Sequence, residues 1–205
     1  EYHDPVRLLR SEVNPTHNVE KFAPVQAERL RFTILRTTDA RPCIDELEVY
    51  STGNTNIALA SGGTKARVSS VFPNSEIHRL EHLNDGKYGN SHSWISNERG
   101  RGWVELEFHE PATIDRIVWG RDREGRFRDR LAVDYRIEVL TRAGDWRVVA
   151  SSGDRQPLLQ GRTLAKEIGL GRLSKDQANE VLAARQQRTT LKARSDELSN
   201  APMVY

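Results

Sequence analysis

The chain has 205 residues, of which 31 are basic and 29 acidic, giving a net charge of +2. This balance argues against a nucleic acid partner, because such partners select strongly basic surfaces. No apolar run approaches the roughly 18 residues that a membrane-spanning helix needs. The single cysteine, Cys43, excludes an internal disulfide and two-cysteine zinc or haem motifs, and its apolar strand context predicts a small core residue.

Taken in chain order, residues 1–21 show no hydrophobic period and predict an irregular lead-in. Residues 28–35 alternate apolar and polar side chains, which predicts a strand with one buried face. A polar loop leads into residues 43–50, a second predicted strand. The alternation slips there at Asp45-Glu46, as a β-bulge would cause.

Residues 83–96 form a long polar stretch that ends at Trp94. Asp85-Gly86 is a turn signal, because glycine tolerates a positive φ and aspartate can bond its own backbone. Strict alternation over residues 103–108 predicts a strand. Further strands are expected at 114–120, 133–140 and 145–150.

This ordered series resembles a discoidin domain, the coagulation factor V/VIII type C family that includes carbohydrate-binding module family 32. The resemblance rests on the Asp85-Gly86 loop ending in Trp94-Ile-Ser and on the strands that follow it, and it covers about two thirds of the chain. It implies an all-β fold, a jelly-roll β-sandwich of the galactose-binding-like type, in which loops at one end bind the ligand.

The strands at 28–35 and 43–50 resemble the closing pair of such a domain, which in the family stands at the other end of the sequence. No equivalent pair follows Ser152. Two explanations are open: the early strands are a remnant of a preceding copy, or the domain is circularly permuted. Residues 22–152 suit one complete domain, and a copy without its last strands would expose a sheet edge. These points favour permutation.

After a linker at 153–173, a helix is expected at 174–199, opened by a capping box at Ser174 and Gln177. We expect this C-terminal helical extension either to pack against a neighbouring region or to be a solvated linker helix. The whole arrangement resembles the interior of large planctomycete proteins that carry cytochrome-c-like domains. It implies a segment of a longer polypeptide with neighbouring domains as partners, in an extracytoplasmic location.

Catalysis is not expected, because acids, histidines and nucleophiles do not converge in a known pattern. The six histidines form no His-Glu-x-x-His signature, and His78 and His82, four residues apart, lie in a loop context. A Gly-x-Ser-x-Gly motif and a Gly-rich phosphate loop are both missing.

The resemblance also implies a structural Ca²⁺ between the Asp-Gly loop and a glutamate on the closing strand. Calcium takes six to eight oxygen ligands, which small polar turns can supply. The side chains matching the family pattern are Asp85 and Glu46, with Asn90 or Ser91 completing the shell and carbonyl oxygens from around His82, Lys87 and Asp45. The alternative is a plain Asp-Gly turn beside a surface glutamate.

Ligand residues should lie in loops rather than on the strands. The four tryptophans fall on strand motifs, so core packing is expected for Trp94, Trp103, Trp119 and Trp146. The Arg-rich loop at 120–131 has an isolated aromatic ring, and two further polar loops accompany it. The candidate ligand-binding residues are Arg121, Arg123, Phe127, Arg101, Asn97 and His78.

Two functions remain open for these loops. In the first, the guanidinium groups of the arginines and the phenylalanine ring bind a glycan or polysaccharide, as in a non-catalytic carbohydrate-binding module. In the second, the same loops form ion pairs with a neighbouring domain, and the chain is a structural or protein-interaction domain without a sugar ligand. The plain alternative for the loop charges is mutual salt bridges on a solvated rim, which contribute little individually.

Overall fold

The computed structural model describes residues 9–158 together with residues 180, 183, 184, 187 and 191. The first eight residues of the expected lead-in, the linker beyond residue 158 and nearly all of the expected helix at 174–199 lie outside the described residues. Val13–Ser152 forms one compact unit, and the flanking residues belong to a second unit. Within the described part of the chain, no helix is long and apolar enough to span a membrane.

The compact unit Val13–Ser152 is built from antiparallel strands. In chain order the elements are β1 (Asn18–Thr37), β2 (Cys43–Ile44), β3 (Glu46–Ser51), η1 (Ala60–Gly62), β4 (Lys65–Val68), η2 (Leu80–His82), β5 (Trp94–Ile95), β6 (Gly102–Gly120), β7 (Ala132–Thr141), β8 (Trp146–Ser151) and η3 (Ser152–Asp154). The main sheet has the order β3-β6-β1-β7-β8, with β4 also paired to β6, and β2 pairs with β5.

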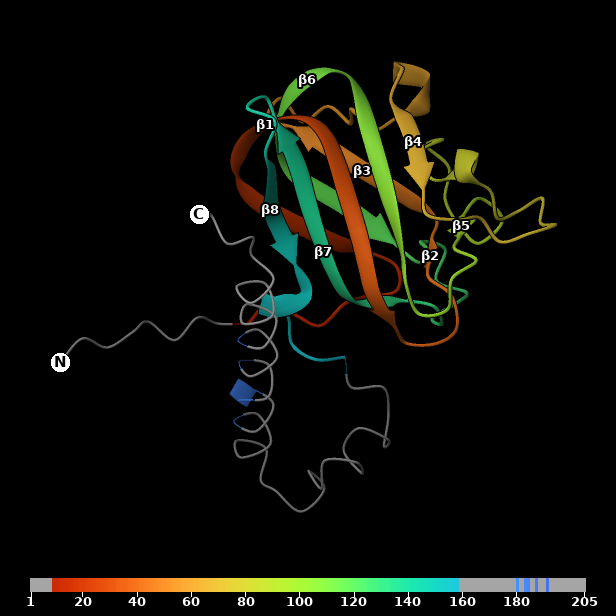
Figure 1. Ribbon diagram of the computed structural model, residues 1–205. Coiled ribbons are helices and arrows are strands. Elements are labelled where there is room, and N and C mark those ends of the chain that lie inside the picture. The colour runs from red at the N-terminus through yellow and green to blue at the C-terminus, as the bar shows by residue number, and fades with distance from the viewer. Residues whose placement is uncertain (1–8, 159–179, 181–182, 185–186, 188–190, 192–205) are drawn as a thin grey trace, which may run out of the picture. The chain divides into compact units, whose positions relative to one another are not determined.

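Two long strands, β1 and β6, pair with each other along most of their length (Figure 1). Their register breaks between Lys21 and Val25, where Pro24 cannot donate to the ladder. A second break lies opposite the β6 segment that contains Pro111. These irregularities bend the strands, so that the first half of β1 and the second half of β6 form one layer with β3.

The remaining halves of β1 and β6 form the second layer with β4, β7 and β8. The aromatic rings of Phe32, Trp119 and Tyr135 meet edge to face between the layers, with centroids 5.2 Å apart in each pair. All three side chains are at most 1% exposed. The fold is therefore an all-β sandwich closed over one apolar core.

The early residues are integral to this sandwich. Residues 28–35 lie in β1, where Leu30 is the register partner of Leu106 in β6 and of Val139 in β7. Residues 43–50 divide into β2 and β3 at Asp45, the position where the alternation slips. A chain without these strands would lack the centre of its main sheet.

β1 begins at Asn18, earlier than the boundary expected at residue 22. The reason is a polar contact inside the core. The fully buried Glu20 carboxylate accepts hydrogen bonds from Trp119 Nε1 at 3.2 Å and from the Tyr135 hydroxyl at 2.5 Å. A buried glutamate satisfied in this way leaves no hydrophobic period in the sequence.

The tryptophans do not all occupy the core. Trp94 and Trp119 are fully buried, as predicted, but Trp103 is only half-buried. The core prediction is wrong for Trp146, which is 37% exposed and stacks with the Arg31 guanidinium 4.5 Å from its ring centroid. β8 is an edge strand, and none of its residues is buried.

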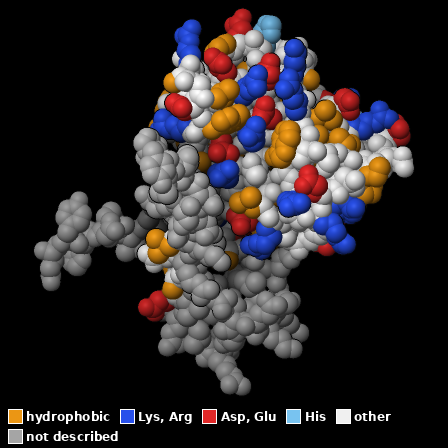
Figure 2. Space-filling view, viewed as in Figure 1, with side chains coloured by type: hydrophobic (Ala, Val, Ile, Leu, Met, Phe, Trp, Pro, Cys, Tyr) orange, Lys and Arg blue, Asp and Glu red, His pale blue; other side chains and the backbone are white. Residues whose placement is uncertain are grey.

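The outer face of the second layer carries paired charges. Arg31 binds Glu105 at 2.6 Å, and Arg29 binds Glu107 at 3.1 Å, across the β1–β6 pair. Basic and acidic side chains are interspersed over the face shown in Figure 2. This mixture matches the near-zero net charge and gives no continuous basic field on that face.

Candidate functional site

A cavity of about 210 Å³ opens among the loops near the β2–β5 pair. Its lining comes from the segments before and after residue 80, from β5 and from the Arg-rich loop after β6. The lining residues are Phe72, His78, Asn90, Ile95, Arg121, Phe127, Asp129 and Arg130. The structure thus brings three of the predicted ligand residues, His78, Arg121 and Phe127, to one pocket.

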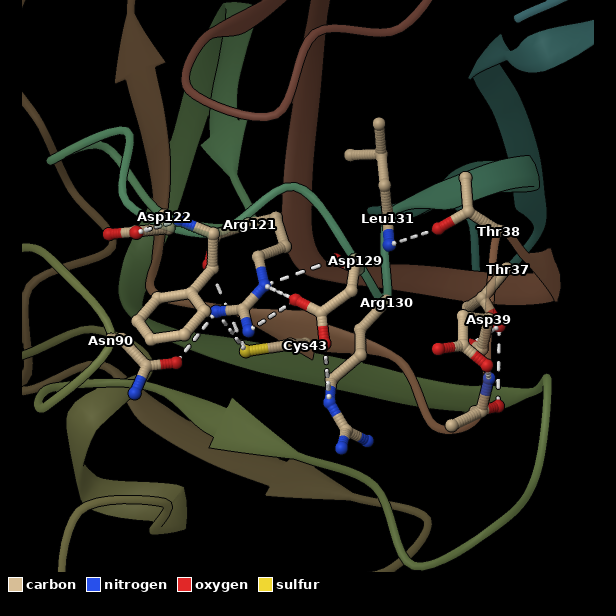
Figure 3. A network of polar contacts seen from close by, with 12 residues as sticks. Thr37, Thr38, Asp39, Cys43, Asn90, Arg121, Asp122, Asp129, Arg130 and Leu131 are labelled. Carbon is tan, nitrogen blue, oxygen red and sulfur yellow. Dashed lines mark hydrogen bonds and ion pairs between the residues drawn. The ribbon is translucent and has the colours of Figure 1, made fainter. Parts of the chain in front are cut away.

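Arg121 is a buried residue of this pocket that bonds to several of its neighbours. Its side chain is 2% exposed, and its Nη2 lies 2.9 Å from Asp129 Oδ1. Nη1 donates to Asn90 Oδ1 at 2.9 Å and to Cys43 Sγ at 3.3 Å (Figure 3). The guanidinium carbon lies 5.1 Å from the Phe127 ring centroid. Arg121 therefore holds the pocket walls together rather than offering free donors.

Phe127 is positioned by hydrogen bonds within its own loop. The buried Asp122 carboxylate accepts the Phe127 N–H at 2.8 Å and the Glu124 N–H at 3.3 Å, which fixes the turn between them. The ring remains 42% exposed. Phe127 therefore offers an exposed apolar ring at the pocket lining.

Arg130 was not among the predicted ligand residues, although it lies in the predicted loop. Its backbone has φ +56°, a conformation that non-glycine residues seldom adopt. Nε pairs with Asp129 Oδ2 at 3.1 Å, while Nη1 is buried and has no acceptor among the described residues. Backbone strain and an unmet buried donor are features that concentrate at binding sites.

His78 forms another part of the wall. Its Nδ1 lies 2.8 Å from Ser93 Oγ, and its ring meets Phe72 edge to face at 6.5 Å. Burial lowers the pKa of His78 below its ordinary value, and the positive charges of Arg121 and Arg130 lower it further. The imidazole is therefore neutral at neutral pH and can both donate and accept hydrogen bonds.

Three predicted ligand residues lie away from the pocket lining. Arg123 is held by Glu48 at 2.7 Å, in a pair that is mostly buried. Arg101 pairs with Glu98 at 3.2 Å on the surface. Asn97 is exposed, and its carbonyl oxygen accepts from Arg41 Nε at 3.2 Å. Their position in or near the Arg-rich loop suggested ligand binding, but the sequence does not show that each already has a partner within the protein.

Phe72 was also missed by sequence analysis. It stands before Pro73 in a stretch without a strand or helix period, so no local signal marked it. Its ring carries the Arg41 guanidinium 5.3 Å from the centroid. Phe72 thus connects the half-buried Arg41 and the exposed Asn97 to the pocket lining.

The expected calcium ligands partly converge. Glu46 is fully buried, and its Oε1 accepts the Gly86 N–H at 3.1 Å, directly after Asp85 in the turn. Its Oε2 is buried and has no hydrogen-bond partner within the residues that the structure describes. Burial raises the pKa of Glu46 to about 9, and the nearby carboxylates of Asp85 and Glu48 contribute to the rise. A cation beside Glu46 and Asp85 would give Glu46 Oε2 a partner and would offset the repulsion between the neighbouring carboxylates.

Asp85 forms the predicted turn, because its Oδ1 accepts the Lys87 N–H at 2.8 Å. The rest of the expected shell departs from the family pattern. The Asn90 side-chain oxygen is turned to Arg121, so that residue belongs to the pocket wall, and Ser91 is exposed. The residues that fit Ca²⁺ are therefore Glu46 and Asp85, with loop carbonyl oxygens and water as the remaining ligands.

Comparison with known proteins gives no family assignment. No protein-family model matches this chain, and neither a curated protein nor a solved structure matches it.

Proposed function

We propose that this chain is a non-catalytic glycan-binding domain that acts within a larger polypeptide. The observation that carries the proposal is the pocket in which two phenylalanine rings lie beside Arg130, whose Nη1 is buried and finds no acceptor in the described part of the chain. Sugar hydroxyl oxygens are acceptors that such a donor can bind, and apolar sugar faces pack on aromatic rings.

The size and composition of the pocket support a small polar ligand. A cavity of about 210 Å³ lies below the roughly 300–1,000 Å³ typical of drug-sized ligands. It suits one sugar unit at the end of a chain or in a branch. Asp129 adds a hydrogen-bond acceptor, and the neutral His78 imidazole adds a donor and an acceptor. The pocket therefore offers both the donors and the acceptors that hydroxyl groups need.

The proposal includes the discoidin-like assignment in its circularly permuted form. It is supported by the all-β sandwich and by the position of β1 between β6 and β7. A jelly-roll connectivity of the galactose-binding-like type and an extracytoplasmic location belong to the same proposal. We also propose a structural Ca²⁺ at Glu46 and Asp85, supported by the orphaned Glu46 Oε2.

A glycan array followed by calorimetric titration of the 205-residue chain tests the function. We expect Phe127→Ala and Arg130→Met each to abolish binding of the sugar that the array identifies. Two matched controls should bind it like the parent: Arg126→Met, which removes an exposed arginine paired with Glu124 in the same loop, and Leu35→Ala, which trims a 57% exposed side chain in β1.

The same experiment separates the second candidate, a structural or protein-interaction domain without a sugar ligand. The internal ion pairs of Arg101 and Arg123 with Glu98 and Glu48 are the observations that favour it. No binding across a broad glycan set, or equal binding by Phe127→Ala and the parent, would decide for that alternative.

A further inference from the structure

Two histidines and an aspartate converge in the loop between η2 and β5. One ligand atom from each of His82, Asp85 and His92 lies within 4.8 Å of the other two. All three side chains are half-buried, so they are ordered by the fold but accessible to an ion from solvent. We propose that these residues bind a divalent transition metal ion of the zinc class, at a site distinct from the glycan pocket.

The distances suit such an ion. A tetrahedral zinc with bonds of about 2.0–2.2 Å places its ligand atoms about 3.3 Å apart. His92 Nδ1 lies 3.1 Å from Asp85 Oδ2, close to that spacing. The His82 and His92 rings have centroids 4.9 Å apart. The His82 ligand atom lies within 4.8 Å of the other two, and ion binding would draw it closer.

The His82 imidazole is presented in the right form, whereas His92 Nδ1, which faces the Asp85 carboxylate, would exchange its proton for the ion. His82 Nδ1 lies 3.2 Å from the Ile77 carbonyl oxygen, which can only accept, so Nδ1 carries the proton. The lone pair of His82 then resides on Nε2. A carbonyl oxygen that fixes the tautomer and orientation of a histidine in this way is the usual support of a metal-binding imidazole.

The donor set decides the class of ion. Imidazole nitrogen suits zinc, copper, iron and nickel, whereas calcium and magnesium select oxygen. Two histidines and one carboxylate leave one or more positions for water. The ligands come from both ends of the loop at 82–92, so the ion would close that loop as a clip and order it.

This site differs from the proposed calcium site although both use Asp85. The calcium site requires the Glu46 carboxylate and oxygen ligands, while the transition-metal site requires the two imidazoles. Variants can therefore test the calcium site and the transition-metal site separately. Glu46→Gln should leave transition-metal binding unchanged, and substitution of either histidine should remove it.

Titration of the metal-free 205-residue chain with Co²⁺ and Zn²⁺ tests the proposal. We expect one equivalent of Co²⁺ to give the visible absorption of a nitrogen- and oxygen-ligated ion, and Zn²⁺ to displace it. His82→Gln and His92→Gln should each weaken binding at least about tenfold. His109→Gln, which replaces an exposed histidine outside this cluster, should bind like the parent.

A second measurement keeps the test valid if a variant is poorly folded. Zn²⁺ should raise the midpoint of thermal unfolding of the parent and of His109→Gln, and should not raise that of the folded His92→Gln variant. Lack of Co²⁺ uptake by the parent would overturn the proposal. So would Co²⁺ binding by His82→Gln and His92→Gln at the affinity of the parent.

Discussion

Glu46 offers a prediction whose size follows from its burial. The carboxyl group is fully buried, and its pKa is raised from 4.5 to about 9. The metal-free folded protein therefore holds a proton that the unfolded chain releases above about pH 4.5. Folding stability that is fully present below that pH is lost as the pH rises toward 9. We expect Glu46→Gln, which cannot ionise, to abolish this loss.

The magnitude follows from linkage between protonation and folding. Between the unfolded and folded pKa values, the parent should lose about 1.4 kcal/mol of unfolding free energy per pH unit relative to the variant. From about pH 6 to about pH 8 this relative loss amounts to about 3 kcal/mol. The amide of the variant can still accept the Gly86 N–H that Glu46 Oε1 accepts, so the comparison changes ionisation while keeping that contact.

Urea unfolding in EDTA, followed by tryptophan fluorescence, measures this difference across the pH range. Titrating groups far from Glu46 affect parent and variant alike, so the difference between the two reports on Glu46 and the carboxylates of Asp85 and Glu48 that interact with it. Glu81→Gln, which removes an exposed carboxylate in η2, is the matched control and should follow the parent. A difference between parent and Glu46→Gln that stays constant with pH would refute the argument, because it would mean that Glu46 ionises as easily in the fold as in the unfolded chain.

Three further predictions address the metal and the core. Removal of Ca²⁺ by EDTA should lower the midpoint of thermal unfolding by several degrees, since an ion at a hundredfold excess over its Kd contributes about 3 kcal/mol; added Ca²⁺ should restore it in the parent but not in Asp85→Ala. Phe32→Ala should cost about 3–5 kcal/mol in urea unfolding, because its ring contacts both Trp119 and Tyr135, and a cost below about 1 kcal/mol would contradict the described core. Deletion of residues 1–52 should abolish cooperative unfolding rather than reduce stability slightly, because β1 separates β6 from β7.

Much of the fold could be predicted because apolar and polar side chains alternate along the predicted part of β1. Leu30, Phe32 and Ile34 alternate with polar residues and are at most 1% exposed. The continuation of β1 through Pro24 could not be predicted, because proline normally ends a strand and its bend is stabilised only by the pairing with β6. Nor could the start of β1, where Glu20 is satisfied by rings from distant strands.

The candidate site was predicted less completely than the fold. Arg-rich composition located the loop that carries Arg121 and Phe127, but composition does not state which arginine is already paired. Arg123 is held by Glu48 and Arg130 by Asp129, and both keep buried donors that have no acceptor among the described residues, but of the two only Arg130 lines the pocket. That difference depends on contacts between segments far apart in the chain, which only the folded structure shows.

The most direct test of glycan binding is an amide NMR titration of the 205-residue chain with the sugar that a glycan array identifies. The account predicts saturable shift changes concentrated at the residues that line the pocket, above all His78, Phe127 and Arg130, with little change in β8. Saturable changes centred elsewhere, or a spectrum that no glycan alters, would contradict it.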